Sequence, residues 1–363
     1  MEENQFEVRT DLAVEAKDMY VEKDESKEEQ IEGVVVSEKE IGRVKVTNVE
    51  VDEVGAKHIG KNAGSYHTVY SDAIKKQDTS FQEETAKVVT SQLLDLMSKN
   101  NVAQDASGLI VGLGNRNVTP DALGPLVVDK VLVTNHLFIH EPQYVQEGYR
   151  KVATFTPGVM GVTGIETSDI IQGVMDKYQP GFVIAIDALA SRSIERVNAT
   201  IQLSDSGIHP GSGVGNKRKE LSKETLGVPV FAIGVPTVVD AVTITSDAID
   251  YVFKHIGKEW REKDKPSKAL APAGLQLGDQ SLSEEDLPSL EKRQKIFGMI
   301  GALDEQEKRA LMQEVLTPLG HNLMVTPKEV DGYISDMAHL LAQSINAAMH
   351  ENINIDNFAQ YTR

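Results

Sequence analysis

The chain reads FVIAIDALASR from residue 182 to residue 192, and this stretch decides the fold. Its first five residues are all apolar, and the polar Asp187 follows them directly. Two further apolar runs, at residues 109–113 and 228–233, also stop at a polar or glycine-rich turn that a helix-length segment follows. Strands that are apolar on both faces and separated by helices are typical of a mainly parallel sheet covered on both sides. We therefore predict an α/β fold in which helices flank a mainly parallel sheet.

The chain on either side of this region adds strands at its beginning and helices at its end. Residues 33–36 and 44–51 are predicted strands, so an N-terminal β-containing segment precedes the sheet. The last helix is predicted to begin with Thr326 as its N-cap and Pro327 as its first residue. Its apolar side chains recur every three or four residues and predict one buried face; they are Val330, Ile334, Met337, Leu341, Ile345 and Met349.

The composition excludes several classes of protein. The 363 residues include no Cys, which excludes disulfides, thiolate catalysis and cysteine-bound metal centres. The net charge of −18 argues against a basic surface that binds nucleic acid directly. No apolar run approaches the roughly 20 residues that span a bilayer, and the acidic N-terminus does not resemble a signal peptide. We expect a soluble cytoplasmic protein that contacts neither nucleic acid nor a membrane.

Two aspartates follow apolar runs and are the first candidates for chemistry. Ligands of an open α/β sheet bind beyond the carboxyl ends of its strands, where Asp121 and Asp187 are expected. Each has an alternative role as the N-cap of the helix that follows it. If the two strands are neighbours, the carboxylates share one crevice, and their mutual repulsion raises one pKa and leaves an acid beside a base. Such a pair can activate water against a peptide carbonyl. A third strand-end aspartate, Asp240, is expected to be structural or to support the catalytic residues without reacting itself.

Two other readings of the sequence stay open. Asp121, Asp187 and a histidine such as His209 can hold a divalent ion in a metal-assisted peptidase, although no metal-binding motif is present. The glycine-rich loop at residues 209–219 ends in the basic side chains Lys217, Arg218 and Lys219 and can bind an anion without any catalysis. We expect no cofactor and no metal, and assign the basic side chains to substrate binding.

Several long stretches together resemble the germination proteases of spore-forming bacteria. The resemblance extends over nearly the whole chain, through residues 184–218 and shorter stretches that are far more specific than a short motif. These read VRTDLAVE at residues 8–15, VGLGN at 111–115, VTPDALGP at 118–125, PGVMGVTGIETSD at 157–169 and PLGHNLMVTPKE at 318–329.

This resemblance implies a function and a fold. Members of the family degrade small acid-soluble spore proteins at germination, are made as self-processing zymogens, and form homotetramers in the spore core. Their two proposed catalytic aspartates correspond to Asp121 and Asp187. The fold is expected to be phosphorylase/hydrolase-like and similar to that of the hydrogenase-maturation endopeptidases.

The resemblance also implies a propeptide. The family is similar in cutting after an acidic residue and before an apolar one, and Asp11-Leu12 offers that pair. We therefore expect residues 1–11 to be a propeptide and residues 12–363 to be a single catalytic domain. A loop-rich excursion is expected at about residues 263–295, where prolines and glycines recur.

Overall fold

The computed structural model describes residues 10–22, 31–209, 219–262, 282, 284–316, 323–355 and 357. The chain divides into two compact units, a larger one made of Arg9–Val239 and Thr326–Arg363 and a smaller one that contains Asp240–Val325. The fold is α/β, and the described residues form a mixed sheet of nine strands flanked by helices. The division into a propeptide and a catalytic domain stays a prediction.

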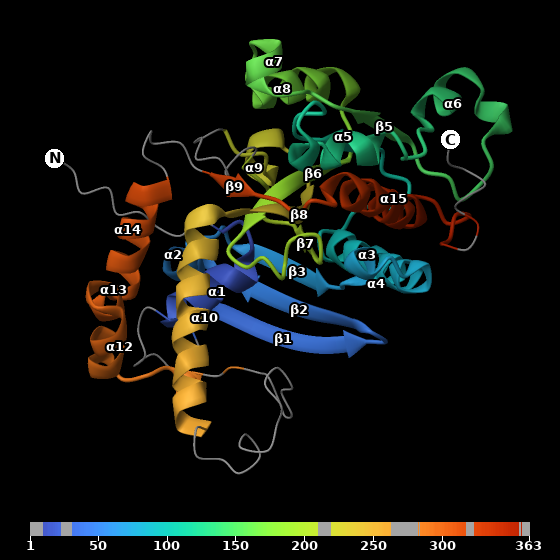
Figure 1. Ribbon diagram of the computed structural model, residues 1–363. Coiled ribbons are helices and arrows are strands. Elements are labelled where there is room, and N and C mark those ends of the chain that lie inside the picture. Colours follow the sequence, from blue (N-terminus) through green and yellow to red (C-terminus); the bar gives the residue numbers. More distant parts are fainter. Residues whose placement is uncertain are drawn as a thin grey trace. The chain divides into compact units, whose positions relative to one another are not determined.

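Eight strands of the sheet follow the order β1-β2-β3-β7-β8-β6-β4-β5 (Figure 1). The three apolar runs form β4, β6 and β8, which together with β5 make the parallel part, as predicted. The strands from β1 to β8 in this order pair antiparallel, so the sheet as a whole is mixed and the prediction of a mainly parallel sheet is wrong: the N-terminal strands and β7 extend the parallel part with antiparallel pairs. The strands are β1 (Val34–Ile41), β2 (Val44–Val51), β3 (Gly64–Tyr70), β4 (Gly108–Gly112), β5 (Val152–Phe155), β6 (Phe182–Ser191), β7 (Thr200–Ser204) and β8 (Val230–Asp240).

Helices of the larger unit cover both faces of its strands. The longest are α4 and α15, and several others are single turns next to strand ends. They are α1 (Ala13–Glu22), α2 (Glu53–Ile59), α3 (Ala73–Lys76), α4 (Thr79–Lys99), η1 (Thr119–Asp121), α5 (Leu123–Val128), α6 (Asn135–His140), η2 (Pro142–Tyr144), α7 (Met160–Thr163), α8 (Thr167–Tyr178), α9 (Lys223–Leu226) and α15 (Val330–Met349).

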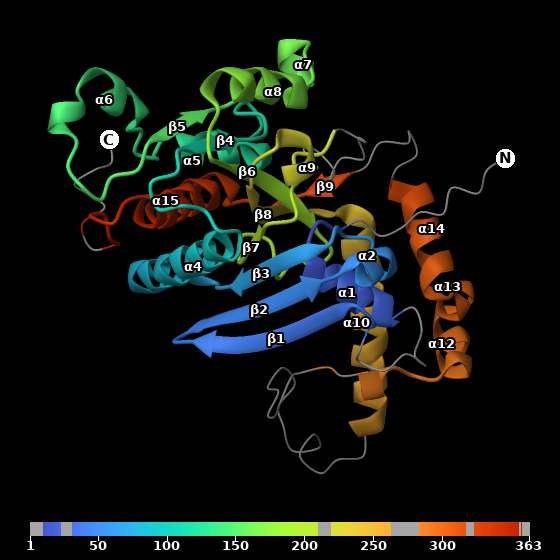
Figure 2. The ribbon, with the colours of Figure 1, turned by 180° about the vertical axis from the view of Figure 1, so that it is seen from behind.

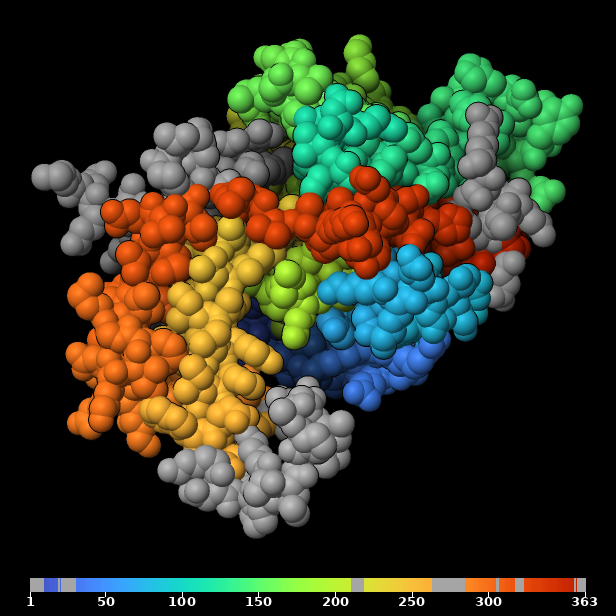
Figure 3. Space-filling view, viewed as in Figure 1, coloured from blue at the N-terminus to red at the C-terminus, as the bar shows by residue number. Residues whose placement is uncertain are grey.

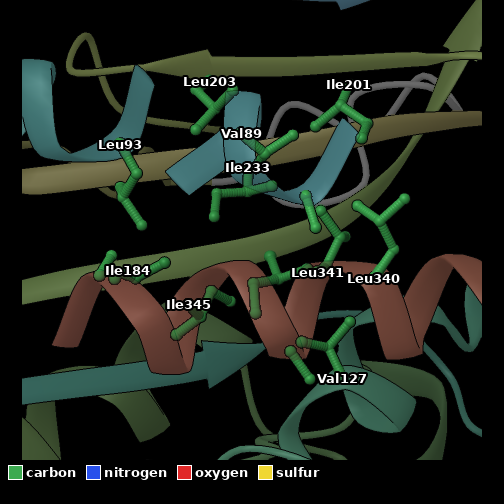
Figure 4. Packing of buried hydrophobic residues seen from close by; sticks show 14 of the residues in the cluster. Val89, Leu93, Val127, Ile184, Ile201, Leu203, Ile233, Leu340, Leu341 and Ile345 are labelled. Carbon is green, nitrogen blue, oxygen red and sulfur yellow. The ribbon is translucent and has the colours of Figure 1, made fainter. Parts of the chain in front are cut away.

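One face of the sheet packs against α4, α5 and α15. Figure 4 shows Ile184 and Ile233 of the central strands facing Leu341 and Ile345 of α15. The helices α4 and α15 lie side by side, which is also visible on the surface in Figure 3. Of the predicted apolar positions of α15, Val330 is partly buried and the other five are buried; these are Ile334, Met337, Leu341, Ile345 and Met349. This main cluster supplies most of the hydrophobic stabilisation of the larger unit.

The other face carries two smaller apolar clusters. Ile171 and Met175 of α8 pack against β4 and β6, through residues such as Val183. Ala13 and Ala16 of α1 pack against β2 and β3. Figure 2 shows these three elements from behind. Between these two clusters, the same face of the sheet carries polar side chains.

The last helix begins later than predicted. Its first residue is Val330 and its N-cap is Glu329, not Thr326. The Thr326 hydroxyl instead donates a hydrogen bond to the Thr237 carbonyl of β8 at 2.9 Å. This bond holds Thr326 against β8, and the helix begins four residues later.

The smaller unit is helical apart from the short β9 (Met324–Val325). Within it, α10 packs against α14, and the rings of Phe253 and Phe297 lie 4.6 Å apart. The predicted excursion at residues 263–295 lies partly outside the described residues, and its last part is helical. The helices are α10 (Ala241–Glu262), η4 (Glu284–Asp286), α12 (Leu290–Phe297), α13 (Met299–Ala302) and α14 (Glu305–Leu316). Among the described helices, none combines the length and apolar composition needed to cross a membrane.

A buried histidine beyond α15 makes the stability of the larger unit depend on pH. The His350 side chain is fully buried, and its Nδ1 accepts a hydrogen bond from the Arg150 N–H at 3.2 Å. Burial lowers the pKa of His350 to about 4, and the positive charge of Arg150 acts in the same direction. Below pH 6.5 the unfolded chain therefore binds a proton that the folded chain does not bind until about pH 4.

We expect the free energy of unfolding to fall by about 3 kcal/mol as the pH drops through this window because of His350 alone. The variant His350→Asn removes the titration and keeps an acceptor for Arg150, so it should lose this part of the pH dependence. Urea unfolding between pH 4 and pH 7 measures it. His140 is exposed, and His140→Asn is the matched control. If the free energy of unfolding depends on pH equally in the wild type, His350→Asn and His140→Asn, the prediction is contradicted.

Candidate functional site

Asp121 ends the short helix η1, in the loop that follows β4. Its Oδ2 accepts a hydrogen bond from the Asn115 N–H at 2.8 Å, and its carbonyl accepts from the same N–H at 3.0 Å. Ala122, not Asp121, is the N-cap of α5, and it makes no side-chain cap. The alternative that Asp121 caps the next helix is therefore wrong. Its carboxylate instead fixes the turn between β4 and η1.

Asp187 lies inside β6 and not at its end. The strand continues to Ser191, and Asp187 is buried. Its Oδ1 accepts a hydrogen bond from the Ala188 N–H at 2.9 Å. A carboxylate is costly to bury unless polar groups surround it, so this position within a strand marks it as a functional candidate. It is no helix cap, since no helix begins in the residues that follow.

The elements that carry the two aspartates are in contact. The strands β4 and β6 are parallel neighbours, and the Leu113 N–H after β4 donates to the Ile186 carbonyl at 2.8 Å. The helix η1 packs against β6, and the Thr237 hydroxyl of β8 donates to the Pro120 carbonyl at 2.7 Å. Asp121 is thus held where β4 ends, beside β6 and β8, which both continue beyond this point. The structure places η1, which carries Asp121, against β6, which carries Asp187, and the catalytic roles of both residues stay a prediction.

Glycines allow the loop after β4 to approach this edge closely. A Cβ on Gly114 would lie 2.1 Å from the Asp121 carbonyl oxygen, and the Gly114 φ is +105°. A Cβ on Gly124 would lie 2.3 Å from the Leu113 carbonyl and 2.6 Å from that of Ile186. No side chain fits at such distances, so these positions require glycine. They hold η1 and α5 tightly against β4 and β6.

The predicted cleavage site lies against the extension of β6 beyond Asp187. The Asp11 N–H donates to the Ala190 carbonyl at 3.2 Å, and the Asp11 carboxylate accepts from the Ala190 N–H at 2.9 Å. Leu12 is fully buried, and its carbonyl accepts the first hydrogen bond of α1 from Ala16. The bond between Asp11 and Leu12 thus precedes α1 directly and is fixed on the sheet.

Side chains around this segment hold it further. Lys61 donates to the Thr10 carbonyl at 2.9 Å, and burial lowers the pKa of Lys61 although Asp11 and Glu15 oppose the shift. The Thr10 hydroxyl bonds to the buried Glu15 carboxylate. Glu15 also accepts from the Arg192 N–H at 2.8 Å and forms a salt bridge of 3.3 Å with Arg196. These contacts fasten the start of the described chain to the loop after β6.

No contact among the described residues brings the basic side chains assigned to substrate binding close to Asp121 or Asp187. Lys217 and Arg218 lie outside the described residues. Lys219 is exposed and forms a 2.8 Å salt bridge with Asp169, which raises the pKa of Lys219. The assignment of these three residues stays a prediction.

The remaining candidates have local partners. His209 Nε2 lies 3.8 Å from a Glu220 carboxylate oxygen. Asp240 accepts from the Val242 N–H at 2.8 Å at the start of α10, as expected for a structural residue. No group of three or more His, Cys, Asp or Glu side chains in the described part of the chain is arranged to hold a metal ion.

Sequence reasoning missed the polar side chain of Gln202, which bonds to the Asp11 carbonyl and to the Ala13 N–H. It also missed Ala190, whose contribution comes from the main chain and leaves no trace in residue type. One signal was available for Gln202: residues 200–204 read TIQLS, in which polar and apolar residues alternate, yet all five are buried. A buried polar side chain needs partners, and those of Gln202 belong to Asp11 and Ala13.

Comparison with known proteins identifies the family of this chain. A family model described as germination protease matches residues 13–362. The chain is 63% identical to the germination protease of Oceanobacillus iheyensis over 100% of both chains. It is 58% identical to that of Priestia megaterium and 56% identical to that of Bacillus cereus, in each case over 99% of this chain and 98% of the relative. The chain therefore belongs to the germination protease family, and it is a peptidase.

Proposed function

We propose that this peptidase is an endopeptidase that begins the degradation of small acid-soluble spore proteins during germination, and that Asp121 and Asp187 activate the attacking water. The observation that carries the proposal is that Asp187 follows the last β6 residue paired with β4, at the edge of the sheet where β4 ends, and that η1, which carries Asp121, packs against β6. Ligands of α/β sheets bind at this edge.

The chemistry needs no covalent intermediate. One aspartate, as the carboxylate, takes a proton from water while the oxygen of that water attacks the carbonyl carbon of the scissile amide. The other, as the neutral acid, gives its proton to the departing nitrogen as the C–N bond breaks. Two nearby carboxyl groups share protons in this way because both do not ionise easily together. A general acid and a general base each contribute about 10²- to 10⁴-fold.

The proposal includes self-processing between Asp11 and Leu12, which removes residues 1–11. The segment that contains this bond is bonded to β6 beyond Asp187, so the chain carries a peptide of acidic-apolar sequence next to the proposed catalytic edge. The proposal further includes a homotetramer, location in the spore core and a phosphorylase/hydrolase-like fold. Light scattering on the purified chain measures the assembly.

We expect the incubated full-length chain to yield a product that begins at Leu12, as measured by intact-mass and N-terminal mass spectrometry. The variant Asp11→Ala should slow this cleavage at least 10-fold because the acidic side chain and its bond to Ala190 are lost. Asp18→Ala on α1 removes a carboxylate outside the segment and is the matched control. A mature N-terminus other than Leu12 would contradict the predicted propeptide boundary.

A further inference from the structure

Both the nitrogen and the oxygen of the Gln202 side-chain amide form hydrogen bonds with the chain around the Asp11-Leu12 peptide. Its Nε2 donates to the Asp11 carbonyl at 3.2 Å, and its Oε1 accepts from the Ala13 N–H at 2.7 Å. The first partner is the carbonyl of the predicted scissile bond, and the second is the N–H one residue beyond that bond. The amide therefore fixes the peptide on both sides of the atoms that react.

The sheet register places Gln202 in line with Asp187. Gln202 of β7 pairs with Gly234 of β8, and Gly234 pairs with Asp187 of β6. Residues paired across strands project from the same face, and two strand spacings amount to roughly 10 Å. The residue between the two has no side chain, and Leu189 fills the space above it, since a Cβ there would lie 2.3 Å from Leu189 Cδ1. The peptide hydrogen-bonded to Gln202 thus lies on the face of the sheet that carries the Asp187 carboxylate.

Ala190 contacts both the main chain and the carboxylate of Asp11. Its N–H donates to the Asp11 carboxylate while its carbonyl accepts from the Asp11 N–H, so one residue of β6 holds both the main chain and the side chain of Asp11. A carboxylate accepts such a bond more strongly than a neutral group does. Beyond Ile186, β6 extends past the end of its neighbour β4, and extended peptides add to strands at such edges.

We infer that Gln202 and the main chain of Ala190 form the peptide-binding subsite of this enzyme: Gln202 is a positioning residue that aligns the scissile amide, and Ala190 recognises the acidic side chain before it. The inference rests on the proposed cleavage after Asp11. Residues 10–13 occupy this subsite in the uncleaved chain. Once the cut has removed residues 1–11 and the new N-terminus at Leu12 has left the subsite, protein substrates with an acidic residue followed by an apolar one take the place of residues 10–13.

The test compares Gln202→Met with the wild type in the full-length chain. Cleavage at Asp11-Leu12 is followed by mass spectrometry, and a blocked peptide with the sequence of residues 8–15 is supplied as a second substrate. Because a small misplacement of reacting groups costs about 100-fold, we expect both rates to fall by about that factor. Thr200→Val alters a buried side chain of β7 on the same face and should retain wild-type rates. Wild-type rates and cleavage position in folded Gln202→Met would overturn the inference.

A second variant separates positioning from a merely structural role. In Gln202→Glu the carboxylate still accepts from the Ala13 N–H, but it donates to the Asp11 carbonyl only when it is protonated. The rate of this variant relative to wild type should therefore rise as the pH falls towards 4. This ratio decides the matter if Gln202→Met does not fold, and a ratio independent of pH would overturn the inference. A wild-type chain that never cuts after Asp11 would instead contradict the proposed self-processing, which separates the two failures.

Discussion

Replacing Asp187 by Asn should leave the protein folded and lower its rate of peptide hydrolysis by about 10²- to 10⁴-fold. The amide has nearly the shape of the carboxylate and can still accept a hydrogen bond from the Ala188 N–H, but it neither takes nor gives a proton. Asp121→Asn should have an effect of similar size, and the double variant should be little worse than either single one because the two groups act as a unit. Single-turnover hydrolysis of a peptide with the sequence of residues 8–15 measures all three.

Asp240→Asn is the matched control for these variants. Asp240 also ends a predicted strand, but its carboxylate caps the start of α10. Its replacement should change the stability by about 1 kcal/mol and leave hydrolysis unchanged. Near-normal hydrolysis by both Asp121→Asn and Asp187→Asn would refute the two-aspartate mechanism. Loss of wild-type activity on exhaustive chelation, restored by a divalent ion, would favour the metal-assisted alternative.

The central sheet was predictable because the composition of its strands is distinctive. Residues 182–186 have no polar side chain, and only a strand buried on both faces, or a buried helix, tolerates that. The strands β3 and β7 were not predicted. In β3, the polar Ser65, His67 and Thr68 are buried, which local hydrophobicity does not indicate. These strands acquire their burial from α1, α4 and the segment around Asp11, which are distant in sequence.

The site was predictable only where function resides in a side chain with unusual surroundings. Asp187 follows an apolar run, and that contrast is visible in the sequence. The position of Asp11 against Ala190 and Gln202 depends on pairing between residues nearly 200 positions apart. Patterns of neighbouring residues in the sequence do not predict such a long-range pairing. The predicted start of α15 was wrong for the same reason: Thr326 bonds to β8, a strand that lies far away in the sequence.

Gly114→Ala should cost most of the activity without altering any residue that carries a proton. The Gly114 φ of +105° is unfavourable for alanine by about 1–2 kcal/mol, and its Cβ would lie 2.1 Å from the Asp121 carbonyl oxygen. That oxygen belongs to the backbone, so the turn that holds the Asp121 carboxylate against Asn115 must shift. A displacement of about 1 Å lowers the rate about 100-fold.

Gly164→Ala separates displacement of Asp121 from backbone strain. Gly164 follows α7 with a φ of +73°, and no atom lies within 4 Å of the position that an alanine Cβ would take, so alanine there meets strain alone. Both variants should lose about 1–2 kcal/mol in urea unfolding, with a further loss in Gly114→Ala from the clash. Only Gly114→Ala should lower kcat, because only there does the added methyl group push on the chain that carries a reacting carboxylate. Equal kcat values for the two variants would mean that the turn at Asp121 does not set the geometry of the reaction.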